Sequence, residues 1–170
     1  MDGLDLGLFL MRAMAGLLMA GHGAQKLFGW WGGSSMTKWA ADLEARQGIR
    51  PGWLWAWVSV GGQFFAGLAL AAGFLTPVAA AASLVGPMAV VVVQRWSKGF
   101  FNVRGGYEFM LSILLIGVAL AFTGPGAISV DAALGLTIPL PFRLAIVAAA
   151  VVGALVAVLP ARSAAEPAAR

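Results

Sequence analysis

Five long apolar segments, separated by shorter polar stretches, dominate this chain. Apolar runs of about 18 or more residues are typical of helices that cross a bilayer, and the shorter segments reach that length with their flanks. Because such helices satisfy their backbone hydrogen bonds internally, the pattern predicts an all-α, polytopic membrane protein. The five segments are 4–21, 53–75, 78–93, 109–124 and 144–159.

The connections between the segments predict their arrangement. The second and third are joined by the short stretch "GFLTPV", in which Pro77 suits the start of a helix. We therefore expect an antiparallel four-helix transmembrane core over 1–141, with an irregular Gly/Pro-bounded loop at 124–141. A fifth, C-terminal transmembrane helix is expected at 142–160, and its length leaves open whether it spans fully. The Ala/Pro-rich tail, 161–170, is expected to be disordered.

The first polar connection predicts a short amphipathic helix near 35–46. Trp39 and Leu43 fall on one face of this helix at i, i+4 spacing, whereas its charged residues fall on another. An apolar face opposite a charged one suits a helix that lies in the headgroup zone. We expect this helix to lie flat at the membrane surface.

Composition supports lipid as the main solvent. The chain is 61% hydrophobic and 11% charged, against about 25% charged residues in soluble domains. It has no cysteine, which excludes disulfides and thiolate ligands, and its single histidine cannot hold a zinc or iron ion alone. No metal is therefore predicted. The net charge of +4 is read as a signal of orientation and not of nucleic-acid binding.

The distribution of Lys and Arg predicts that orientation. With five spans, nine of these residues fall on one side, and only Arg12 and Arg143 fall in the other half. The basic side is expected to face the cytoplasm, which places the N-terminus outside and the C-terminus inside. If the fifth segment does not span, the split becomes seven to four, with the same orientation. All seven tryptophans fall near predicted boundaries on the basic side, as an aromatic belt would.

Small residues and one proline predict close packing in the middle of the chain. Gly61, Gly62, Gly67 and Gly73 of the second segment allow neighbouring backbones to approach. Pro87 in the third segment removes one backbone hydrogen bond, so it is expected to kink the helix or to border a pocket.

Two polar residues lie deep within the predicted spans. A charged residue at bilayer depth costs several kcal/mol and is a functional candidate by default. Arg12 either snorkels to the outer interface or faces the bundle interior, where it meets Gln63, a bound anion or a carbonyl group. Gln63 lies near mid-membrane, where a neutral amide often serves only as an interhelical hydrogen-bonding residue.

A second set of polar residues lies at the end of the first span. His22, Gln25 and Lys26 share one helical face if the helix continues through them, and Gly21 and Gly23 would admit another helix or a ligand. Considered alone, Lys26 can equally be a basic residue that anchors the helix end at the membrane interface. His22 can equally be an interfacial residue whose hydrogen bonds are satisfied. Glu108 begins the fourth span on the same side, so an ion pair between Lys26 and Glu108 is geometrically open and could be purely structural.

Four motifs carry a resemblance to a known family. The stretches "GHGAQKLFGWWGG", "GGQFFAGLALAAGFLTP", "GFFNVRGGYEF" and "TGPGAISVD" occur in the order and spacing of the DoxX family, over roughly residues 6–135. This resemblance implies a small bacterial membrane protein with a four-helix core, located in the plasma (inner) membrane. The fifth span lies beyond that core.

The resemblance also bears on individual residues. Relatives commonly carry a glutamate at the position of Gln63 and a histidine at that of Arg95, so a proton-handling step there would be lost in this chain. The positions that match the family are His22, Gln25, Lys26, Gly106, Tyr107, Glu108 and Asp131. The candidate ligand-binding residues are therefore Arg12, His22, Gln25, Lys26, Gln63, Tyr107, Glu108 and Asp131.

The family resemblance implies a redox association, since DoxD-type relatives are subunits of thiosulfate:quinone oxidoreductase. The first hypothesis is a subunit of a redox complex that binds a quinone at the cytoplasmic end of the first span. The second is a non-catalytic anchor that docks soluble partner proteins, and the third is a small transporter or lipid-binding protein. Homo-oligomers and redox partner proteins are compatible with each. None of these patterns decides whether the chain is an enzyme.

Overall fold

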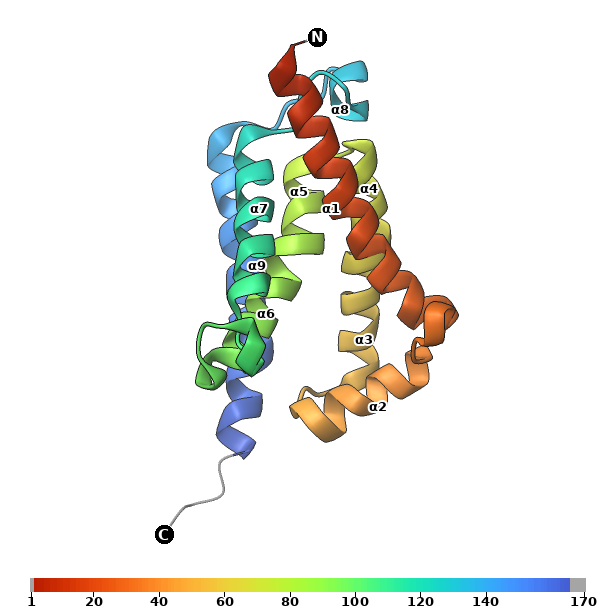
Figure 1. Cartoon of the computed structure of the whole chain (residues 1–170), viewed down its shortest axis with the longest axis vertical. Helices are drawn as coiled ribbons and strands as arrows, with labels where there is room; N and C mark the ends of the chain where they lie inside the picture. The colour runs from red at the N-terminus through yellow and green to blue at the C-terminus, as the bar shows by residue number, and fades with distance from the viewer. Residues whose placement is uncertain (1, 166–170) are drawn as a thin grey trace.

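The computed structural model describes residues 2–165, and residues 159–165 by their backbone alone. Within this range the chain forms helices joined by short connections, and no strand (Figure 1). In chain order the helices are α1 (Gly3–Phe28), η1 (Trp30–Gly32), α2 (Met36–Gln47), α3 (Gly52–Val60), η2 (Gly61–Phe65), α4 (Ala66–Ala72), α5 (Thr76–Ala80), η3 (Ala81–Val85), α6 (Gly86–Arg95), η4 (Trp96–Lys98), η5 (Asn102–Arg104), α7 (Glu108–Thr123), α8 (Val130–Ala133) and α9 (Leu140–Ala165).

The described helices assemble into antiparallel rods, and α2 lies across one end of the bundle (Figure 1). The rods are α1, α3–η2–α4, α5–η3–α6, α7 and α9. All except α7 are long and apolar enough to cross a membrane. The predicted all-α polytopic fold is thus confirmed, and the fifth segment proves to be one of the long helices. The fourth is a helix of 16 residues, about 24 Å long against a bilayer core of about 30 Å.

One loop and the start of the C-terminal tail differ from the sequence-based expectations. The loop at 124–141 contains the short helix α8 and ends where α9 begins at Leu140. The helix α9 continues past Pro160 to Ala165, so it includes residues 161–165, for which the sequence predicts disorder. Residues 166–170 of the expected tail lie outside the described residues.

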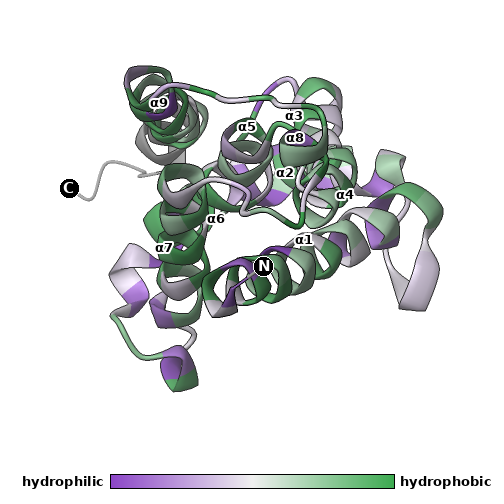
Figure 2. Ribbon diagram, turned by 90° about the horizontal axis from the view of Figure 1, so that it is seen from above, coloured by the Kyte–Doolittle hydropathy of each residue, from purple (hydrophilic) through white to green (hydrophobic). Residues whose placement is uncertain are grey.

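Apolar side chains cover the outside of the bundle as well as its core. Met19, Leu70, Leu84 and Leu120 are buried and pack together, whereas α1 turns side chains such as Met14, which is 74% exposed, outward. Seen along the bundle, the ribbons of the long helices are coloured mostly hydrophobic, and hydrophilic residues form smaller patches among them (Figure 2). A helix that is apolar all round suits lipid and not water.

Helix α1 packs against α4 through glycine. A Cβ atom added to Gly16 would lie 2.5 Å from the carbonyl oxygen of Gly67, and one added to Gly67 would lie 2.8 Å from the amide nitrogen of Ala20. Gly23 makes a similar approach to the backbone of Phe64, at 2.5 Å. The predicted close-packing role of Gly67 is thereby confirmed, since any larger residue would push the two backbones apart.

Two π-helical turns, η2 and η3, interrupt the second and third rods. In each, the amide after the turn donates to the carbonyl five residues earlier, and such turns are frequent at functional sites. The turn η3 ends two residues before Pro87, whose missing N–H and bulky ring disturb the regular ladder. A Cβ atom on Gly62 would lie 2.6 Å from the carbonyl oxygen of Ala82, so the two turns touch each other.

Candidate functional site

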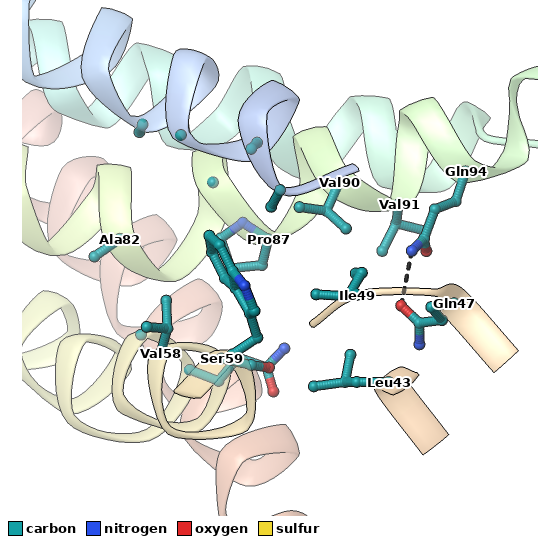
Figure 3. Close-up of a pocket in the computed structure, with 18 of the residues that line it drawn as sticks. Leu43, Gln47, Ile49, Val58, Ser59, Ala82, Pro87, Val90, Val91 and Gln94 are labelled. Atoms are coloured by element: carbon teal, nitrogen blue, oxygen red, sulfur yellow. Dashed lines mark hydrogen bonds between the residues drawn. The ribbon is translucent and has the colours of Figure 1, made fainter. Parts of the chain in front are cut away.

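A cavity of about 460 Å³ lies between α2, the two π-helical turns, α6 and α9. This volume falls in the range of small-molecule sites, about 300–1,000 Å³. Its wall is mostly apolar and includes Leu43, Ile49, Val58, Pro87 and Val90 (Figure 3). Pro87 thus borders a pocket, one of the two roles predicted for it.

One part of the cavity wall carries hydrogen-bond donors. Lys26, in the last turn of α1, donates through Nζ to Oε1 of Gln63, which lies in η2. The same Nζ lies 4.6 Å from the centroid of the Trp39 ring, within the range of a cation–π contact. The Trp39 Nε1 is buried and has no hydrogen-bond partner. A buried N–H without an acceptor is costly, and Trp39 is a lining residue with one unsatisfied donor.

The end of α2 is tied to the end of α6 beside the same cavity. The side chain of Gln94 donates to that of Gln47, with 2.7 Å between Nε2 and Oε1 (Figure 3). Sequence reasoning missed both residues, although each is an uncharged polar residue near the end of an apolar helix. This bond holds α2 across the cavity, where Leu43 and Trp39 form part of the wall.

Small residues of α9 form the remaining wall. Gly153 is exposed although it lines the cavity, and a Cβ atom added to it would meet nothing within 4 Å. Val58 and Ala82 are also exposed lining residues. The cavity therefore opens sideways between the second rod and α9. The α9 residues in this wall are Ala149, Ala150, Gly153, Ala154 and Ala157.

The structure separates the three polar residues at the end of α1. Lys26 lines the cavity, whereas His22 is exposed and Gln25 is half-buried, and neither lines it. The backbone of Gln25 instead packs against Gly33, where a Cβ atom would lie 2.1 Å from the Gln25 carbonyl oxygen. Of the two glycines beside His22, Gly23 admits a neighbouring helix, but Gly21 faces open space.

Tyr107 and Glu108 serve the connection before α7. Glu108 accepts a hydrogen bond from the amide of Asn102, at 2.8 Å, and the Tyr107 ring stacks on Trp96 with 4.9 Å between centroids. The ion pair between Lys26 and Glu108, which the sequence leaves open, does not form among the described side chains. Among the described side chains, the one ion pair within 4.0 Å joins Arg46 to Asp42.

Arg12 lies inside the bundle, at the end opposite α2. It is 1% exposed, donates to the carbonyl oxygen of Ile128, and its guanidinium carbon lies 5.8 Å from the centroid of the Phe9 ring. Of its three side-chain nitrogens, Nε and Nη1 are buried without a partner. The expectation that Arg12 meets a carbonyl is confirmed, while free snorkelling and pairing with Gln63 are both wrong.

Asp131 fixes the turn beside Arg12. Its carboxylate accepts hydrogen bonds from the amides of Leu75 and Thr76, at 2.7 and 2.9 Å, and its own amide donates to the carbonyl of Gly73. Asp131 also borders a second cavity of about 290 Å³ near Arg143. These bonds make Asp131 a cap of α5, at the end of the molecule away from Lys26.

The fold and the cavity define a class, a multi-pass α-helical membrane protein with a laterally open apolar cavity and a few convergent donors. The chain belongs to the DoxX family, whose model matches residues 7–96. This match runs from α1 through α6, and the motifs at 99–109 and 123–131 lie outside it, as does α9. No curated protein and no solved structure matches the chain.

Proposed function

We propose that this chain is the integral membrane subunit of a redox-associated complex, and that its cavity binds a quinone or a similar lipid-soluble carrier. The observation that carries the proposal is an apolar cavity lined by Lys26 and by Trp39, whose buried Nε1 has no hydrogen-bond partner. A donor of this kind stabilises a ligand that brings an acceptor oxygen into the cavity.

The residues around the cavity fit the chemistry of a quinone. Its carbonyl oxygens would accept hydrogen bonds from the Trp39 indole and the Lys26 ammonium group, while its ring would contact the apolar wall. The opening beside Gly153 would let an isoprenoid tail pass into the lipid. The chain has no cysteine and one histidine, so it has few groups of its own that could carry electrons or protons. A bound quinone would carry both.

The orientation follows from the distribution of basic residues. The end of the bundle that carries Lys26 and α2 also carries most of the Lys and Arg residues. We place this end in the cytoplasm, and the start of α1 outside, in a bacterial inner membrane. The cavity would then exchange protons and partners on the cytoplasmic side.

Quinone binding by purified protein in lipid nanodiscs tests the proposal. Menadione titrated into wild-type protein should give saturable binding, and Trp39→Phe, which removes the N–H donor and keeps a smaller aromatic ring, should weaken it about three- to tenfold. Trp53→Phe is the matched control, because Trp53 is 64% exposed and does not line the cavity. Equal weakening by both substitutions would reject the cavity as the binding site.

The same sample separates the scaffold hypothesis from this one. If menadione shows no saturable binding, the quinone proposal fails. A stable, stoichiometric partner protein in a cross-linked pull-down would then favour the role of a membrane anchor for soluble proteins.

A further inference from the structure

The cavity holds an isolated positive charge. Among the described residues that line it, Lys26 alone carries a charge. The groups around its Nζ are the amide oxygen of Gln63 and the face of the Trp39 ring, and both are neutral. Within the described side chains, no carboxylate pairs with this ammonium group.

The neutral groups around Lys26 compensate only part of the cost of burying its charge. A charge removed from water is costly unless an opposite charge and hydrogen bonds compensate for it. A carbonyl oxygen and an aromatic face each offer partial negative charge, which is less than one counter-ion provides. The missing partner can be supplied by a ligand, since Lys26 lines the cavity together with Trp39, whose Nε1 has no partner.

We infer that the cavity selects a ligand with an anionic oxygen head on an apolar body, and that Lys26 is the counter-ion of this head. This inference deepens the proposed function and rests on it. An acidic hydroxyquinone and a fatty acid share the required chemistry, because each presents two adjacent oxygens with one negative charge. One oxygen would pair with the Lys26 Nζ, and the other would accept from the Trp39 N–H.

Two quinones that differ by one acidic hydroxyl group test the inference directly. Menadione is neutral, whereas phthiocol has the same methylnaphthoquinone skeleton and is an anion at neutral pH. Wild-type protein in nanodiscs of zwitterionic lipid should bind phthiocol at least about tenfold more tightly than menadione, because a hydrogen bond to an ionised group is roughly twice as strong. This comparison needs no variant and so does not depend on the folding of one.

Variants then assign the preference to Lys26. Lys26→Met should bind both quinones equally and each more weakly than wild type, because both lose the Lys26 donor and only phthiocol loses a counter-ion, while Lys26→Arg should keep the preference. His22→Ala is the control, since His22 lies one turn earlier on α1 and is exposed. A preference for phthiocol that persists in Lys26→Met would overturn the role given to Lys26.

The possible outcomes separate this inference from the proposed function. Equal affinity of wild type for the two quinones would overturn anion selection and leave quinone binding intact. Absence of binding by both quinones would overturn the proposed function. Displacement of phthiocol by laurate, but not by lauryl alcohol, would support anion selection with a fatty acid as the source. Failure of laurate to compete would support the acidic quinone.

Discussion

The carboxylate of Asp131 is predicted to hold together the end of the bundle opposite the cavity. It accepts the amides of Leu75 and Thr76, which begin α5 directly after a tight turn. Leu75 has a φ of 46°, a left-handed conformation that costs a non-glycine residue about 1–3 kcal/mol. Two hydrogen bonds to one carboxylate offset part of this strain. Replacing Asp131 should therefore destabilise the connection between the second and third rods.

The size of the effect follows from the exposure of the two amides. Thr76 is fully buried, so its orphaned N–H would cost about 1–3 kcal/mol, whereas Leu75 is 39% exposed and would regain part of its loss from solvent. We expect Asp131→Ala to lower the free energy of unfolding by about 2–4 kcal/mol. Asp131→Asn keeps one acceptor oxygen and should lose about half as much.

Reversible unfolding in mixed micelles, followed by circular dichroism while the denaturing detergent fraction rises, measures these differences. Ser129→Ala is the matched control in the same loop, because the Ser129 hydroxyl caps the four-residue helix α8 and donates to the carbonyl of Gly126, both within that loop. Its cost should be about 0.5–2 kcal/mol. If Asp131→Ala costs no more than Ser129→Ala, or if Asp131→Asn costs as much as Asp131→Ala, the carboxylate does not act as described.

Two further predictions concern glycines. Gly16→Ala should destabilise the fold by about 1–3 kcal/mol, because the new Cβ would lie 2.5 Å from the carbonyl oxygen of Gly67. The control Gly21→Ala, whose Cβ would meet open space, should be neutral or stabilising. Equal unfolding midpoints for the two variants would contradict the α1–α4 packing. Gly153→Phe should fill the cavity opening and abolish menadione binding without lowering the unfolding midpoint, while Ala148→Phe, on the same helix but outside the lining, should leave binding unchanged.

The span pattern and the helix faces could be predicted from the sequence because they are local properties. Apolar runs of sufficient length locate α1, the second and third rods and α9. The amphipathic spacing likewise locates α2, which begins after Ser35 as N-cap and ends at Gln47. The small-residue role of Gly67 could be predicted because glycines in apolar helices often allow close backbone approach, but the same expectation is wrong for Gly61, where an added Cβ atom would meet nothing within 4 Å.

The partners of the interior polar residues could not be predicted in the same way. Arg12, Lys26 and Gln63 were all identified as candidates, but pairing them requires the relative height of helices that the linear sequence does not specify. Lys26 meets Gln63 because α1 and the second rod cross through Gly16 and Gly23, which sets their register. Arg12 lies about four turns before Lys26 on α1, so the same register places it beside the loop that contains Ile128.

The cavity illustrates why a site can combine a predictable charge with an unpredictable shape. Lys26 is conspicuous in the sequence, but the space beside it depends on three features that carry no charge: the π-helical turns, the α2 helix held by Gln47 and Gln94, and the small residues of α9. The last of these lies outside the matched DoxX range. The donors therefore belong to the matched core, whereas the opening through which a ligand tail would pass is set by a helix beyond it. Substitutions in α9 should accordingly change which tails fit, and substitutions at Lys26 should change which head groups bind.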